Sequence, residues 1–279
     1  MILLCAYLCK NKLLDYLKFI FYGIIQGLTE FIPVSSTAHL KIISLVFGIN
    51  DPGSSFSAII QIGSVFAIIW YFRKNLFNLK YKKSRDKINK FWSNKFTFSI
   101  FLGTIPIVFF GGIIKVFIPE FYDSFLRSNF SIAVVSVLMA LLMFFADISP
   151  NKSINIKNHT YLDSFFIGIA QAFAIIPGVS RSGATISIAL LSGWEKKEAA
   201  KFSFILGIPA ISIASTVEFF SSLNELATFP FYPLLVGIIT TFFSSLIAID
   251  FVIRYLSYKG LKLFVYYRLI FGILILLNL

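Results

Sequence analysis

The chain is poor in cysteine, histidine and charge. Among its 279 residues are two cysteines and two histidines, and 14% of the residues are charged. Cys5 and Cys9 have neither metal-site nor redox-motif spacing, so they indicate neither kind of chemistry. With 57% hydrophobic residues and a mean hydropathy of +0.83, the composition excludes an ordinary soluble domain.

Apolar runs divide the chain into pieces of membrane-helix length. A hydrocarbon core of ~30 Å needs about 20 apolar residues, and the runs 13–32, 55–72, 96–118, 129–147, 161–177, 198–220, 230–253 and 260–279 are near that length. The runs 36–49 and 182–194 are too short to span. Irregular backbone at membrane depth must be buried in protein or line a wet cavity. We therefore predict an all-α, polytopic integral membrane protein with two re-entrant helix hairpins.

Positive charge is concentrated in one segment. The net charge is +12, and nine Lys and Arg residues fall within 73–95. Cytoplasmic loops of membrane proteins carry such an excess, so we expect a loop that faces lipid headgroups and no nucleic-acid partner. The basic links 148–160 and 254–262 are predicted on the same side, and the acidic turn with Glu120 and Asp123 on the other.

An internal duplication is visible in two places. Pro33-Val-Ser-Ser36 matches Pro177-Gly-Val-Ser180 at an offset of 144, and the segment starting at Phe56-Ser57 matches the one starting at Phe202-Ser203 at an offset of 146. Nearly equal offsets indicate one repeated unit. We predict an N-terminal extension (1–12) and a single membrane domain (13–279) made of two repeats, about 13–147 and 161–279.

The two repeats are predicted to be inverted. If the first two of about ten helical pieces form a hairpin in each half, three pieces cross per half and six cross in total, so the second half is upside down. The segment 221–232, which corresponds to the basic 73–95 segment, holds no Lys or Arg. Opposite membrane sides explain that contrast. The hairpins then enter from opposite faces and meet near the midplane.

The first hairpin carries an acidic and hydroxyl-rich set. Gln26 and Glu30 share a helix face, and Pro33 ends the helix. Ser36 and His39, three residues apart on the next short helix, could supply a nucleophile and a proton-transfer group, with Glu30 as orienter or metal ligand. A charge in apolar surroundings is costly, so Glu30 indicates a functional site.

The second hairpin carries the opposite charge. Pro177-Gly178 breaks the helix, and Ser180 or Ser182 can cap the next one. Free helix N–H groups together with Arg181 suit a phosphate-type anion. An anion clamp that meets a Ser, His and Glu set fits phosphoryl transfer, where catalysis is mostly positioning and charge stabilisation.

At these residues the chain resembles the BacA/UppP family of undecaprenyl-diphosphate phosphatases. The motifs are Gln26-Gly-Leu-Thr-Glu30, Pro33-Val-Ser-Ser-Thr-Ala-His39 and Pro177-Gly-Val-Ser-Arg-Ser-Gly-Ala-Thr185, and the resemblance runs from about residue 17 to the end. Many relatives have Glu where this chain has Gln26, and some have Glu where it has Ser57. The first departure leaves Glu30 as the one protein carboxylate for a metal.

The resemblance implies hydrolysis of undecaprenyl diphosphate to the monophosphate and phosphate, which recycles a lipid carrier for peptidoglycan synthesis and gives bacitracin resistance. It implies a divalent cation, Mg²⁺ or Ca²⁺, held mainly by Glu30, water and substrate phosphates. It also implies a bacterial plasma (inner) membrane location with the site facing the periplasm or cell exterior; self-association is left open. The implied catalytic residues are Glu30, Ser36, His39 and Arg181, and the expected substrate-binding residues are Gln26, Ser35, Thr37, Ser180, Ser182, Gly183 and Thr185.

Three alternatives are weighed against this interpretation. Inverted repeats with broken helices also suit a secondary transporter or a flippase for a polyprenyl phosphate. An acid-phosphatase-type lipid phosphatase needs a Ser-Arg-x5-His element, and Ser187 stands where that His would be. A purely structural membrane protein does not explain two polar hairpins of opposite charge.

Overall fold

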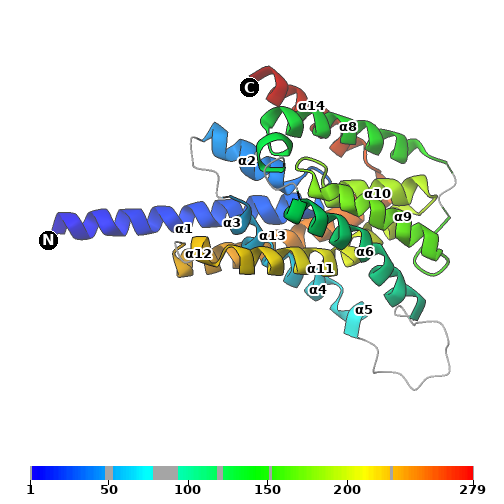
Figure 1. The fold of residues 1–279 in the computed structure, drawn as a ribbon, viewed down its shortest axis with the longest axis horizontal. Helices are drawn as coiled ribbons and strands as arrows, with labels where there is room; N and C mark the ends of the chain where they lie inside the picture. Colours follow the sequence, from blue (N-terminus) through cyan, green and yellow to red (C-terminus); the bar gives the residue numbers. More distant parts are fainter. Residues whose placement is uncertain are drawn as a thin grey trace.

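The fold is helical throughout the part of the chain that the structure describes. The computed structural model describes residues 2–47, 53–77, 94–117, 122–150, 153–226 and 229–278 (Figure 1). Within these ranges the only strand-like feature is an isolated bridge between Ile154 and Trp194. The all-α prediction is confirmed.

The first half of the chain begins with a helix hairpin. Its elements are α1 (Ile2–Phe31), α2 (Ser36–Val46), α3 (Gly53–Ile60), α4 (Ile62–Tyr71), α5 (Arg73–Phe77), α6 (Asn94–Phe117), the π-helical turn η1 (Tyr122–Leu126) and α8 (Asn129–Ile148). The predicted extension 1–12 has no boundary of its own in the described residues, because α1 runs unbroken from Ile2 to Phe31.

The second half follows the same order. Its elements are α9 (Tyr161–Ala172), the 3₁₀ turn η2 (Phe173–Ile175), α10 (Arg181–Leu191), α11 (Lys196–Ser221), α12 (Leu223–Leu226), α13 (Phe231–Tyr258) and α14 (Lys262–Asn278). The single helix α11 stands where the first half has α3 and α4.

By length and composition, four of the described helices could cross a membrane. They are Lys95–Ile114 within α6, together with α8, α11 and α13. The predicted crossing 55–72 is divided at Gln61 into α3 and α4, and the predicted crossing 260–279 is the 17-residue α14. The protein is thus a multi-pass membrane protein, and the total of six crossings stays a prediction.

Helix α1 packs on α13 through glycine and ends inside the bundle. A Cβ on Gly23 would come within 3.0 Å of Thr240 Cβ, and one on Gly27 within 2.8 Å of Ser245 N. These contacts advance along both helices together, so the two are parallel. On that register Phe31 lies level with about residue 249, roughly 14 Å of helix short of the end of α13. This placement is what a re-entrant hairpin requires.

The other hairpin packs in the corresponding way. Gly168 of α9 faces Gly103 of α6, where an added Cβ would come within 2.6 Å of Gly103 Cα. Thus each hairpin lies on the penultimate long helix of the other half, and the last helices, α8 and α14, pack on one another. In Figure 1, α1 and α2 lie toward the side of the N-terminus, whereas α9 and α10 lie toward the opposite side. This exchange supports the two-repeat division, which stays a prediction.

The predicted repeat register is wrong by one residue at the helix breaks. Ser35 (φ 78°) and Ser180 (φ 68°) are the two non-glycine residues with positive φ in the described chain. Each directly precedes an 11-residue helix, α2 or α10. Ser35 therefore corresponds to Ser180, and Ser36 to Arg181. The extra residue is Gly178, whose φ of 97° suits glycine.

Candidate active site

The two hairpins meet at an ion pair between Glu30 and Arg181. Glu30 lies in the last turn of α1 and Arg181 is the first residue of α10. Arg181 Nη2 is 3.2 Å from Glu30 Oε1, and both residues are 9% exposed. The structure thus brings together the two charges that the sequence analysis singled out. Neither half of the chain holds this pair alone.

The second carboxylate oxygen of Glu30 accepts two further hydrogen bonds. Gln26 Nε2 donates to Oε2 at 3.0 Å, and Ser36 Oγ donates to the same oxygen at 3.0 Å. Gln26 is buried, so its amide serves to orient the carboxylate. Ser36 is only half-buried, so it is more accessible than the carboxylate to which it donates.

Arg181 is held by α11 and keeps one unpaired donor. Its Nη1 donates to Ser203 O at 3.1 Å. A side chain at Gly207 would collide with the guanidinium, so this glycine makes room for it. Among the described residues, no acceptor pairs with the buried Arg181 Nε. An unpaired buried donor is costly, and an anionic substrate oxygen would satisfy it.

The turns before α2 and α10 are strained and touch one another. Non-glycine residues with such backbone angles cost about 1–3 kcal/mol each and cluster at functional sites. Ser180 Oγ caps α10 by accepting from Gly183 N at 3.3 Å. A Cβ on Gly183 would lie 3.5 Å from Pro33 Cβ, so the start of α10 abuts the first break. Ser35 makes no side-chain cap bond, and its hydroxyl instead pairs with Thr37 at 3.2 Å.

Both ring nitrogens of His39 are bonded to groups other than Ser36. Its Nδ1–H donates to Ser35 O at 2.7 Å, since a carbonyl can only accept, and its Nε2 accepts from the Tyr267 hydroxyl at 2.6 Å. The ring also stacks on Phe271 with centroids 4.5 Å apart. The predicted pairing of Ser36 with His39 is therefore replaced by Ser36 with Glu30. Tyr267, on α14, was not anticipated from the sequence.

Arg268 joins the two breaks and was also missed. Its side chain is fully buried in α14. The guanidinium donates to Pro33 O at 3.4 Å, to Val179 O at 3.4 Å and to Gly178 O, and its Nε donates to Ser136 O at 3.3 Å. A buried cation that bonds only carbonyl oxygens fixes backbone position. The run 260–279 carries this one Arg amid apolar residues, which is the same signal that identified Arg181.

The remaining predicted residues differ in access. Thr37 is exposed, whereas Ser182 and Thr185 are fully buried. Thr185 Oγ1 pairs with Ser203 Oγ at 2.6 Å, and Ser182 Oγ with Ser180 Oγ at 3.3 Å. The first contact holds α10 against α11, and the second lies within the turn that begins α10. Direct substrate contact by Ser182 or Thr185 stays a prediction.

The site offers few protein ligands for a cation. No group of three or more His, Cys, Asp and Glu residues with metal-binding geometry occurs among the described residues. Among the described residues Glu30 is the carboxylate in contact with Arg181, and Arg181, Gln26 and Ser36 already donate to it. This donor set fits a cation that rests mostly on substrate phosphate oxygens and water, the usual mode for Mg²⁺.

Known proteins are similar to this chain over nearly its whole length. The family model described as "Bacitracin resistance protein BacA" matches residues 19–274. A protein of Prochlorococcus marinus (strain MIT 9515) named undecaprenyl-diphosphatase is 71% identical over 266 residues, 95% of this chain and 100% of that protein. Another of that name, from Trichodesmium erythraeum (strain IMS101), is 44% identical over 279 residues, 97% of this chain and 89% of that protein.

Proposed function

Because the chain belongs to the family of the bacitracin resistance protein BacA, we propose that it hydrolyses undecaprenyl diphosphate to undecaprenyl phosphate and inorganic phosphate. The observation that carries the proposal is the Glu30–Arg181 pair at the junction of the hairpins, with Ser36 on the same carboxylate. The product is a lipid carrier that can re-enter peptidoglycan precursor synthesis. Abundant enzyme of this kind gives resistance to bacitracin.

Arg181 is the phosphate-binding residue of this proposal. Its Nε is unpaired, and the residue itself begins α10, where the first-turn N–H groups of a helix favour an anion. Donors fixed before the reaction stabilise charge that develops on the transferring phosphoryl group and its leaving oxygen. The bond that breaks joins the terminal phosphorus to the bridging oxygen, which leaves on undecaprenyl phosphate.

Glu30 is placed to accept a proton from the attacking group. Ser36 Oγ–H already points at Glu30 Oε2, so either this hydroxyl or a water held in its place can attack the terminal phosphorus. If Ser36 attacks, Glu30 passes the Ser36 proton to the departing undecaprenyl phosphate oxygen and is again ionised. Water then cleaves the phosphoserine, giving one proton to Glu30, which returns it to Ser36 Oγ as the phosphate leaves. Proton transfer by His39 stays a prediction, while its bond to Ser35 O supports the strained turn.

A divalent cation would be held by Glu30 together with water and diphosphate oxygens, as Mg²⁺ or Ca²⁺. When bound, it would neutralise charge on the diphosphate. The residues of the chain still orient the substrate and take up the proton.

We propose that the basic end of the molecule faces the cytoplasm. Several helix ends lie close together at this end of the molecule. His159 Nε2 forms a hydrogen bond with Ser99 Oγ at 2.9 Å. Lys196 pairs with Asp147 at 2.6 Å, beside Gly260. The described basic residues on these and adjoining segments are Arg73, Lys74, Lys95, Lys157, Lys196, Lys197, Lys201, Arg254, Lys259 and Lys262. This distribution fits the positive-inside rule in a bacterial plasma (inner) membrane, with the site open to the periplasm or cell exterior.

Phosphate release by purified protein tests the activity. In detergent with Mg²⁺ or Ca²⁺, wild-type protein should release phosphate from undecaprenyl diphosphate, and Arg181→Lys should lower kcat about a hundredfold because the lost donors act on the transition state. Arg73→Lys, the same exchange at an exposed arginine, is the matched control and should be unaffected. Wild-type protein that binds the lipid without releasing phosphate would favour a flippase instead.

A further inference from the structure

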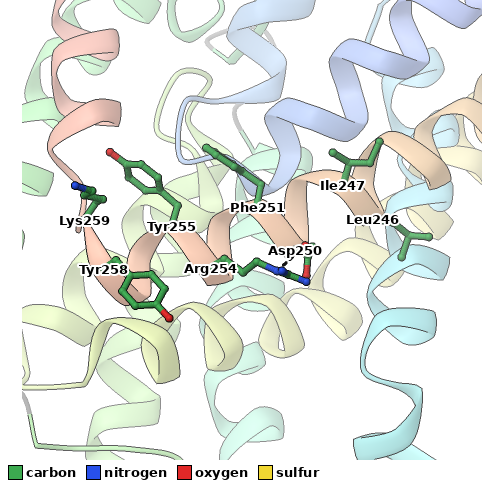
Figure 2. Close-up of a pocket in the computed structure, with 8 residues that line it drawn as sticks. All are labelled: Leu246, Ile247, Asp250, Phe251, Arg254, Tyr255, Tyr258 and Lys259. Atoms are coloured by element: carbon green, nitrogen blue, oxygen red, sulfur yellow. Dashed lines mark ion pairs between the residues drawn. The ribbon is translucent and has the colours of Figure 1, made fainter.

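A groove runs along α13 toward the basic end, and neither Glu30 nor Arg181 lines it. Its volume is about 780 Å³ and its walls are mostly apolar. In Figure 2 the lining side chains follow α13 from Leu246 to Lys259, with the Asp250–Arg254 ion pair midway and Lys259 at the helix end. Thirteen residues of α-helix extend over roughly 20 Å, which is comparable to a lipid acyl chain.

A smaller, polar pocket adjoins the groove. It has a volume of about 400 Å³ and shares Asp250, Arg254 and Tyr258 with the groove. Its other lining residues include Tyr71, Lys197 and Lys201. Three basic side chains and one carboxylate line it, and Glu198 pairs with Lys201, so the formal charge of these groups together is +1. An anionic group is therefore favoured beside an apolar groove.

The cations in this pocket keep free donors. Asp250 is occupied on both oxygens, because Tyr71 donates to Oδ1 at 3.2 Å and Arg254 Nε pairs with Oδ2 at 2.8 Å. That geometry leaves the terminal nitrogens of Arg254 with no acceptor among the described residues. Lys197 is exposed and likewise has no partner there. Lys201 is paired with Glu198 at 2.7 Å, so Arg254 and Lys197 are the available donors.

From this arrangement we infer a binding site for an anionic phospholipid of the surrounding membrane. Its phosphate lies between Lys197 and Arg254, and one acyl chain follows Ile247 and Phe251 along α13. Basic pockets between transmembrane helices suit lipid phosphates, and the apolar groove distinguishes a lipid from free phosphate. The site does not include Glu30, Ser36 or Arg181, so it is separate from hydrolysis.

Native mass spectrometry of the purified, detergent-solubilised protein tests the site. The probes are phosphatidylglycerol and phosphatidylcholine with the same acyl chains. Wild-type protein should bind phosphatidylglycerol more tightly than phosphatidylcholine. The Lys197→Gln/Arg254→Gln double variant should bind it about 30-fold more weakly, since each basic residue near the headgroup contributes about fivefold. Lys197→Gln alone, which leaves the Asp250–Arg254 ion pair intact, should bind phosphatidylglycerol about fivefold more weakly than wild type.

A matched double variant separates a site from general attraction. Lys157→Gln/Lys262→Gln removes the same charge from exposed positions of the basic end outside the pocket, and it should bind phosphatidylglycerol within about twofold of wild type. Equal weakening in both double variants would overturn the site, as would undiminished binding in the pocket variant. Full displacement of the lipid by millimolar inorganic phosphate would also overturn it. So would occupation of the groove by a second copy of the chain, detected as a dimer that Arg254→Gln disrupts.

Discussion

The buried carboxylate of Glu30 accepts hydrogen bonds from three side chains, and each of them comes from a different segment of the chain. Gln26 lies one turn earlier in α1, Ser36 lies beyond the break, and Arg181 comes from the other hairpin. Gln26 supplies a donor to Glu30, whereas the Glu that the family resemblance leads one to expect there would add a second negative charge. The carboxylate is thereby fixed in orientation beside the Ser36 hydroxyl.

The charged residues of the site could be found from the sequence, whereas their contacts could not. Glu30 and Arg181 stand out because charge is costly in apolar surroundings. His39 was expected to serve Ser36, but three residues along a helix do not fix a ring's direction, and packing against Phe271 turns it toward Tyr267. Arg268 was missed because it lies in an ordinary apolar run without a neighbouring motif.

Replacement of Arg268 should weaken the site without changing its reacting groups. Arg268→Gln leaves the carbonyls of Pro33, Gly178 and Val179 short of donors, and each unsatisfied buried group costs about 1–3 kcal/mol. We expect a lower thermal midpoint and a kcat reduced at least about tenfold by misplacement of the breaks. Arg268→Lys keeps the charge but cannot reach several carbonyls at once, so it should recover part of kcat. Wild-type kcat in Arg268→Gln would contradict the positioning role.

At the scale of elements, each hairpin depends on a helix break and on close glycine packing. Pro33 ends α1 as predicted, and Gly178 shifts the second break by one residue, which the sequence alignment of the repeats overlooked. The break between α3 and α4 at Gln61 contains no proline, so the sequence did not predict it. Helix-breaking residues can be recognised in a sequence. The one extra residue in the second helix break could be located only from the backbone angles.

Bulk at the α1–α13 contact should destabilise the first hairpin. In Gly27→Val the added side chain would overlap Ser244 Oγ and approach Thr241 O and Ser245 N. Overpacking typically costs about 1–3 kcal/mol, and here backbone must move. The thermal midpoint should fall and phosphate release should fall with it, because α1 carries Glu30.

Gly112→Ala is the matched control for that experiment. Gly112 is also inside a helix, α6, and a Cβ there meets nothing within 4 Å. Alanine improves helix propensity over glycine by about 1 kcal/mol, so the midpoint should stay or rise. A Gly27→Val variant as stable as Gly112→Ala would show that α1 does not pack tightly on α13.

For the whole molecule, the two halves of the chain bring opposite charges into one site, Glu30 from the first hairpin and Arg181 from the second. The exchange of hairpins between halves, α1 on α13 and α9 on α6, makes the site depend on both halves of the chain. The multi-pass, all-α character was predictable from hydropathy. The meeting of the hairpins followed from charge and repeat order, but the donors of α14 that bind both breaks required the structure.

Orientation can be tested with single cysteines in a background lacking Cys5 and Cys9. Lys157→Cys lies at the basic end and Leu223→Cys at the other, and both residues are exposed. An impermeant thiol reagent added to intact cells should label Leu223→Cys, because the positive-inside rule places the basic end in the cytoplasm. Lys157→Cys should be labelled only after permeabilisation. The reverse pattern would invert the orientation.

A double-mutant cycle on phosphate release tests most directly whether the two hairpins form one catalytic site. Glu30→Gln, Arg181→Gln and the double variant are compared with wild type by kcat/KM for undecaprenyl diphosphate. Residues that act as a unit are strongly non-additive, so the double variant should be within about tenfold of the worse single variant. A double variant slowed by the product of the two single effects would show that Glu30 and Arg181 act independently, and would contradict the account.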